Sequence, residues 1–217
     1  MPILCKIYRG DFIESIHVAY AVVVNEKGDV VFASGDPEYI TCARSVLKPF
    51  QAAATVKSGA TKAAGFIEEE LALMCASHNG EEIHVKTAKS MLGKLELTVE
   101  SYECGTHSPY HKGPRDSLLA QGKEWTALHN NCSGKHAGML CLARHLEGDI
   151  TGYTRREHPV QEHIFNYLQS ITGLKRIPHS IDGCSAPTPF LSLKTVAGLF
   201  QKLASGNDPT LDKLFTA

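Results

Sequence analysis

The sequence predicts a protein of the α+β class, in which a β-hairpin precedes a mainly helical chain. Residues 17–24 and 29–33 are β-branched runs (HVAYAVVV and DVVFA) separated by a polar turn at residues 25–28, the pattern of two paired strands. After residue 43, apolar residues recur at helical spacing, and no later segment is a strong strand candidate. A lone hairpin is marginal in water, so its sheet needs further strands or a helical cover.

The elements expected after the hairpin are helices joined by short loops. Pro49 is tolerated only near the start of a helix, so the first helix should begin close to Ser45 and end before Gly59. Asn79 and Glu82 resemble a capping box for a later helix. Residues 101–114 are rich in Gly, Pro and Ser and predict a loop. The expected helices cover residues 43–58, 66–74, 80–94, 131–145, a segment from 159, and 192–204.

Composition bounds the class of protein. The chain has 217 residues, 43% hydrophobic and 21% charged, with a net charge of −1, which is typical of a globular protein. We expect a single domain over residues 1–217 and no nucleic-acid partner, because no basic patch is present. The absence of a long apolar run and of a signal-peptide layout predicts a cytoplasmic protein without a membrane partner. The seven scattered cysteines predict reduced thiols.

Ser45 and Lys48 are three residues apart at the expected start of a helix. Residues at this spacing share a helix face, so a neutral lysine amine could take the serine proton and make the hydroxyl a nucleophile. The N–H groups at the helix start would stabilise an oxyanion, and burial would lower the lysine pKa. A helix-capping serine followed by a surface lysine has the same spacing, so the pair alone also fits a structural role.

Ser77 lies in the polar segment Ser77-His78-Asn79-Gly80, between two expected helices. Its hydroxyl could relay a proton or hold a substrate amide. A simple helix-linking turn fits the same residues equally well.

Two cysteine segments suggest either a metal site or a reactive thiol. Cys132, Lys135 and His136 lie at another expected helix start, and Cys184 lies in a loop with Gly and Pro. Two thiolates with nitrogen donors suit zinc. Alternatively, Cys132 could be a nucleophile with His136 as its base, or the thiols could be inert and buried.

Taken together, the segments RSVLKPFQ, CASHNGEE, NNCSGKHAGML and DGCSAP resemble the asparaginase II family, the thermolabile L-asparaginase type. The resemblance runs from about residue 5 to the C-terminus in the same order, and residues 104–109 are also similar. Four separate matches are far more specific than any one of them, so they favour function over the structural alternatives.

The resemblance implies the fold of serine β-lactamases and glutaminases, in which an antiparallel sheet backs a helical region. It implies hydrolysis of L-asparagine to L-aspartate and ammonia. By motif, Ser45 would be the nucleophile, Lys48 its base and Ser77 the second active-site serine.

The resemblance also implies a zinc ion beside the substrate, held by Cys132, Lys135 and Cys184. A lysine ligand is unusual and must be neutral to bind. His136 and Asp182 lie next to these positions and are expected to contact the substrate amine or to support the ligands.

Members of this family continue beyond the position at which this chain stops, with closing strands and a further lysine in a Lys-x-Gly-Ala-Glu-Gly-like segment. We therefore expect the sheet to lack strands, and the exposed hairpin to favour a homodimer or aggregation. The alternatives to an asparaginase are a glutaminase-like or β-lactamase-like hydrolase of another amide, and a truncated, non-catalytic remnant that keeps a zinc-binding helical core.

Overall fold

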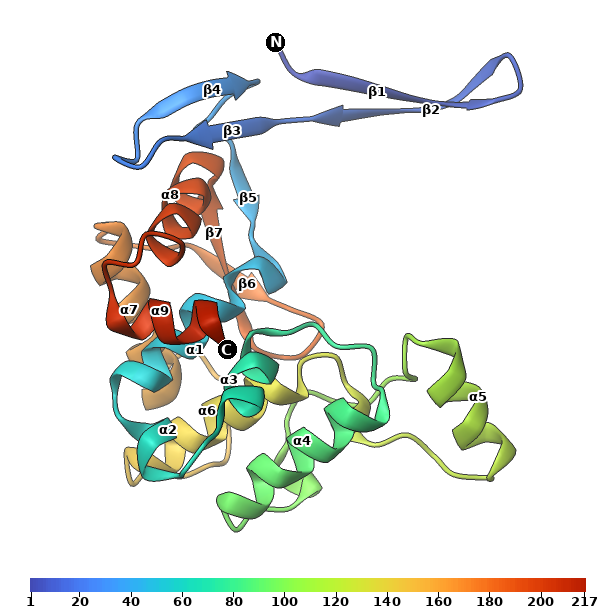
Figure 1. Cartoon of the computed structure of the whole chain (residues 1–217), viewed down its shortest axis with the longest axis vertical. Helices are drawn as coiled ribbons and strands as arrows, with labels where there is room; N and C mark the ends of the chain where they lie inside the picture. Colours follow the sequence, from blue (N-terminus) through green and yellow to red (C-terminus); the bar gives the residue numbers. More distant parts are fainter.

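The computed structural model describes residues 1–217 and shows an extended β-ribbon that projects from a mainly helical body (Figure 1). All strand pairs are antiparallel, and the longer helices are gathered in the body, so the predicted α+β class is confirmed. In chain order the elements are β1 (Ile3–Arg9), β2 (Phe12–Ala19), β3 (Ala21–Val24), β4 (Val30–Ser34), β5 (Ile40–Cys42), η1 (Arg44–Leu47), α1 (Lys48–Lys57), α2 (Ala60–Ala63), α3 (Glu68–Cys75), α4 (Glu82–Lys94), η2 (Val99–Ser101), α5 (Lys112–Ala120), η3 (Ala127–His129), α6 (Ser133–His145), α7 (Pro159–Thr172), β6 (His179–Ile181), β7 (Pro187–Ser192), α8 (Leu193–Leu203) and α9 (Pro209–Thr216).

The ribbon consists of two hairpins placed end to end (Figure 1). β3 and β4 form the predicted hairpin, but the strand expected over residues 17–24 is divided at Tyr20 between β2 and β3. The Asn25 side chain closes the turn by accepting the N–H groups of Lys27 and Asp29 at 2.9 Å. β1 and β2 form a further hairpin whose first strand the sequence reasoning missed. Charged residues interrupt the apolar pattern of β1, so it carries no clear strand signal.

A third sheet, of three strands in the order β5-β7-β6, lies within the body. The sequence holds no strong strand candidate after the hairpin, so these three strands were not predicted. Pro187 and Pro189 lie in the central strand, and proline normally argues against that position. Because β5 leads into η1 and the loop at residues 182–186 leads into β7, this pairing brings the Cys184 loop close to Ser45.

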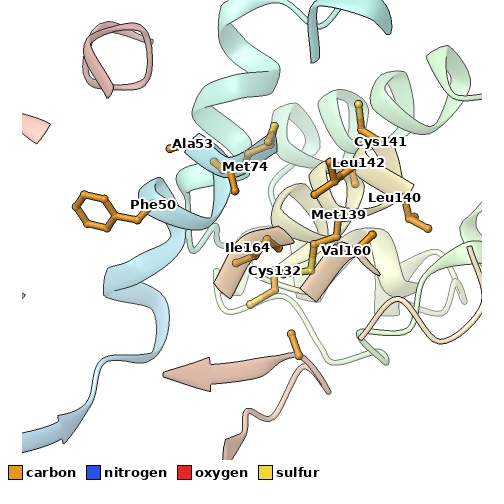
Figure 2. Close-up of a cluster of buried hydrophobic side chains, with 14 of the residues drawn as sticks. Phe50, Ala53, Met74, Cys132, Met139, Leu140, Cys141, Leu142, Val160 and Ile164 are labelled. Carbon is orange, nitrogen blue, oxygen red and sulfur yellow. The ribbon is translucent and has the colours of Figure 1, made fainter. Parts of the chain in front are cut away.

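The helical body is built around α6. Every α6 residue from Ser133 to Ala143 is buried, and α1, α3, α4 and α7 pack against it. Figure 2 shows apolar side chains from α1, α3, α6 and α7 in this core, including Phe50, Met74, Met139 and Ile164. The hydrophobic effect therefore fixes the position of α6, and with it the segment that starts at Cys132.

Several helix ends differ from the expected ones. The first helix begins with the 3₁₀ turn η1, and α1 follows from Lys48. The predicted Asn79–Glu82 capping box is wrong, because the Glu81 N–H donates to His84 Nδ1 (3.2 Å) at the start of α4. α5 begins inside the segment expected to be a loop. None of the helices combines the length and the apolar character that a bilayer crossing requires.

Candidate active site

Lys48 is the first residue of α1, and only 1% of it is exposed. Its Nζ lies 2.5 Å from the carbonyl oxygen of Ala76, 3.1 Å from that of Asn131 and 2.9 Å from Ser77 Oγ. No carboxylate contacts the amine, so its partners are all neutral. Burial lowers the pKa of Lys48, and Cys132 opposes this effect. The neutral amine therefore forms at a lower pH than for an ordinary lysine.

The expected hydrogen bond between Ser45 and Lys48 is not present, because the amine reaches Ser77 and two carbonyl groups instead. Ser45 lies in η1 and is partly exposed. Its neighbour Arg44 adopts a φ of 45°, which is uncommon outside glycine. The structure therefore divides the three predicted residues into a pair, in which a buried Lys48 contacts an exposed Ser77, and a partly exposed Ser45.

A pocket of about 160 Å³ opens beside Ser45, and its wall also includes Cys132, Asp182 and Cys184. Drug-sized ligands occupy about 300–1,000 Å³, so this pocket suits a small molecule. Larger hollows of about 360 and 600 Å³ elsewhere on the surface contain none of the predicted site residues.

The pocket carries one charge of each sign. Arg44 Nε and Nη2 donate to Asp182 Oδ1 at 3.1 and 2.8 Å. The Asp182 side chain is 11% exposed and the Arg44 side chain 67% exposed, so the guanidinium remains accessible. The sequence motif contains Arg44, but the reasoning from residue types assigned it no role.

The two predicted cysteines lie together behind the pocket. Cys132 and Cys184 share a hydrogen bond that lowers the pKa of Cys184 and raises that of Cys132. Lys135 Nζ donates to Cys184 Sγ at 3.1 Å. All three side chains are buried, with exposed fractions of 4%, 7% and 5% for Cys132, Lys135 and Cys184.

His136 is fully buried below these residues. Its Nδ1 lies 2.7 Å from Tyr153 Oη, and its Nε2 has no hydrogen-bond partner. Burial lowers the pKa of His136, which keeps the ring neutral. Tyr153 comes from a distant loop, so the sequence held no signal for this contact.

No group of three or more His, Cys, Asp and Glu side chains is arranged to hold a metal ion. The predicted zinc ligands are two cysteines and one lysine, so they contain only two side chains of these four types. The structure brings Cys132, Lys135 and Cys184 together, as these residues would have to lie in order to bind one metal ion.

A sequence model described as L-asparaginase II matches residues 5–217, almost the whole chain. The chain belongs to the asparaginase II family. A search of curated proteins found no match. Membership of this family points to an amidohydrolase. The pocket beside Ser45 is lined by the Arg44–Asp182 ion pair and lies near the buried Lys48 amine.

The structure of this asparaginase II family member also brings to the candidate site residues that the sequence reasoning missed. The carbonyl of Asn131 accepts a hydrogen bond from Lys48, and its N–H donates to His107 Nε2 at 2.9 Å. His78 Nε2 lies 2.8 Å from Ser133 Oγ, which ties the Ser77 loop to α6. Backbone partners of this kind carry no residue-type signal, although Asn131 and His78 lie inside segments that carried the family resemblance.

Proposed function

We propose that the protein is an L-asparagine amidohydrolase that uses serine nucleophilic catalysis with a lysine base. The observation that carries the proposal is the buried Lys48 amine, with neutral partners only and in contact with Ser77, beside a pocket of about 160 Å³ that Ser45 lines. Family membership supports the reaction class. The pocket volume supports a small amide substrate.

The partners of Lys48 suit the neutral amine. A neutral amine has two N–H groups and one lone pair, and Lys48 has two carbonyl acceptors and one hydroxyl neighbour. In the proposed mechanism the N–H groups point to Ala76 and Asn131, and the lone pair accepts the Ser77 proton. General-base catalysis of this kind contributes roughly 10²–10⁴-fold in rate.

We assign Ser45 as the nucleophile because it lines the pocket, and Ser77 as the proton relay to Lys48. Ser45 Oγ would attack the side-chain amide carbon of asparagine, and its proton would pass to Lys48. The resulting Lys48 ammonium would give the proton to the amide nitrogen as the C–N bond breaks, so that ammonia leaves and a serine ester remains. Water would then hydrolyse the serine ester and release aspartate.

Arg44 and Asp182 are proposed to recognise the amino-acid part of the substrate. Their opposite charges lie on the pocket wall and match an α-carboxylate and an α-ammonium group. Charge-assisted hydrogen bonds of this type are stronger than neutral ones. Asparagine would therefore be oriented with its amide toward Ser45.

Zinc binding by Cys132, Lys135 and Cys184 is part of the proposal. Two sulfurs and one amine lie together, and the nearby His136 Nε2 lacks a partner, so these residues fit a cation with nitrogen and sulfur ligands. When bound, zinc would supply a Lewis acid that orients and polarises the substrate. The chain's own residues perform every proton transfer described above.

We also propose a homodimer formed through the β1–β2 ribbon. One ribbon face carries Leu4, Tyr8, Ile13, Ile16 and Val18, each 46–59% exposed. At about 100 Å² apiece, two copies would bury about 1,000 Å², the lower limit for a specific interface. A second copy is the occupant that this area supports.

Ammonia release from asparagine and glutamine tests the proposed function. We expect turnover of asparagine to exceed that of glutamine, and Ser45→Ala and Lys48→Met each to lower kcat by roughly 10²-fold or more. Because burial lowers the pKa of Lys48, kcat should rise with pH and level off below the ordinary value of 10.5. Ser117→Ala, an exposed serine on α5, is the matched control.

The same assay separates the alternatives. Preferred turnover of another amide would replace asparagine as the substrate but keep the serine and lysine roles. Zinc binding without any turnover would identify a non-catalytic remnant. A folded Ser45→Ala variant with unchanged kcat would contradict the assignment of the nucleophile.

A further inference from the structure

We propose that His107 is a positioning residue for the Ser45–Lys48–Ser77 site. It holds the peptide group of Asn131 so that the adjoining carbonyl receives a hydrogen bond from the Lys48 amine. The expected effect on catalysis rests on the proposed function. The contact between His107 and Asn131 does not depend on that function.

The backbone of Asn131 is held from both ends. Its N–H donates to His107 Nε2 at 2.9 Å. Its carbonyl oxygen accepts from Lys48 Nζ at 3.1 Å and from the His78 N–H at 3.3 Å. The imidazole therefore lies at the start of a contact chain that ends at the proposed base.

The hydrogen bonds of His107 define its tautomer. Nδ1 lies 2.8 Å from the carbonyl oxygen of Ser108, which can only accept, so Nδ1 carries the proton. Nε2 is then an acceptor, as the Asn131 N–H requires. The Asn131 amide oxygen also lies 3.3 Å from Nε2, and a half turn of this amide would make its NH₂ a second donor.

The ring is held by its surroundings as well as by its hydrogen bonds. It stacks on Tyr110 with centroids 4.8 Å apart and an interplanar angle of 25°. The same segment is tied to the Ser77 loop, because the His111 N–H donates to the Asn79 carbonyl at 3.3 Å. His107 and Tyr110 both line the pocket beside Ser45, so the residue that positions Asn131 also borders the substrate space.

A rigid side chain with one acceptor and one donor suits this role. If the Nε2 acceptor were removed, the Asn131 N–H would lose its partner, and the carbonyl facing Lys48 would lose its support. Small displacements of positioning groups cost up to about 10²-fold in rate. We therefore expect the chemical step to depend on this acceptor more than substrate binding does.

The experiment compares His107→Gln, which keeps an acceptor near the Nε2 position, with His107→Leu, which removes it. Kinetics on asparagine should show a kcat lower by on the order of 10- to 100-fold for the leucine variant, with a smaller change in KM. The glutamine variant should recover most of the kcat. His163→Leu, at a partly exposed histidine on α7, is the matched control.

Two measurements without substrate separate this inference from the proposed function. Histidine ¹⁵N spectra of the wild type should show His107 protonated at Nδ1 and not at Nε2. Hydrogen exchange should show a protected Asn131 amide in the wild type and the glutamine variant, and a faster one in the leucine variant. If both hold but asparagine is not hydrolysed, the proposed function fails and the positioning contact stands.

The opposite tautomer, or equal Asn131 protection in the two His107 variants, would overturn the positioning role. Equal kcat in folded glutamine and leucine variants of an active enzyme would do the same. The Tm of each variant identifies any loss that comes only from unfolding.

Discussion

Lys48 and Lys94 differ in what their amines contact. Lys94 Nζ lies 2.8 Å from the buried carboxylate of Glu70, which is a counter-ion for that amine. The Lys48 amine contacts two carbonyl groups, the Ser77 hydroxyl and the Cys132 thiol, and no carboxylate. A buried cation without a counter-ion is costly, so the environment favours the neutral amine that a general base requires.

His78 makes the free energy of unfolding depend on pH in the acidic range. Its Nδ1 accepts the Gly80 N–H at 3.1 Å, and its pKa falls from 6.5 to about 3, mainly through burial. Between these values the unfolded chain binds the proton and the folded chain does not, so stability is retained above pH 6.5 and lost as pH falls toward 3. One such group contributes a slope of up to about 1.4 kcal/mol per pH unit.

His78→Asn keeps an acceptor near the Nδ1 position but cannot titrate. We expect its unfolding free energy, measured with denaturant from pH 7 to pH 4, to fall less steeply than that of the wild type by about one proton's slope. His163→Asn, on the α7 surface side, is the control. Identical slopes for wild type and His78→Asn would show that another group controls acid stability.

Cys184 is the residue at which the zinc proposal is most directly tested. Elemental analysis of protein purified without chelator should find zinc in the wild type, and less in Cys184→Ser. Ligand sulfurs must be deprotonated, so occupancy should fall as pH is lowered. Cys5→Ser, on the exposed ribbon, should leave the metal content unchanged.

Thiol alkylation distinguishes the rival chemistry. If Cys132 were the nucleophile, its alkylation in metal-free enzyme would abolish turnover. If zinc mainly orients the substrate, Cys184→Ser should raise KM more than it lowers kcat. Wild-type protein that contains no zinc and binds none on addition would end the metal proposal.

At the scale of elements, the close contact between α3 and α6 positions the site. A Cβ built on Gly134 would lie 2.2 Å from the carbonyl oxygen of Leu73, which is backbone and cannot move alone. Gly134 lies between Cys132 and Lys135, and Leu73 lies four residues before Ser77. The glycine therefore lets the thiol site and the serine loop approach one another.

Gly134→Ala should push α3 and α6 apart and lower the unfolding free energy by about 1–3 kcal/mol. Gly198→Ala is the matched control, because a Cβ there, within α8, meets no atom within 4 Å. That change should raise stability by about 0.5–1 kcal/mol through backbone entropy. Thermal and denaturant unfolding measure both, and a neutral Gly134→Ala would contradict the tight α3–α6 contact.

At the scale of the whole molecule, the ribbon is the least buried part of the structure. Every β2 residue other than Ser15 is exposed, among them Phe12 at 80%. α8 packs against β3, but no helix packs closely against β1 or β2 (Figure 1). Exposed strand edges and apolar faces of this kind favour association.

We expect wild-type protein to form a dimer whose population rises with concentration in light scattering and analytical ultracentrifugation. Leu4→Lys with Ile16→Lys places charges on the apolar ribbon face and should shift the protein to a monomer. Ile83→Lys, an exposed apolar position on α4, is the control. A wild-type monomer at all concentrations would refute the ribbon interface.

Much of the site was predictable because its residues lie in short segments. Ser45, Lys48, Cys132 and Lys135 each occur near a helix start, where N–H groups and close spacing favour chemistry, and Pro49 marks the first of these starts. The β3–β4 hairpin was predictable from β-branched runs and a polar turn. These signals are local, so no knowledge of distant contacts was needed.

The sequence by itself determined the class of fold, the family and the set of reactive side chains. Only the tertiary structure decided how those side chains pair. Lys48 meets Ser77 and the carbonyls of Ala76 and Asn131, which lie 28 to 83 residues away along the chain, and not the hydroxyl of Ser45 three residues before it. Burial in the core directs the amine inward, and backbone carbonyls, which every residue possesses, receive it, so no pattern of residue types could have revealed these partners.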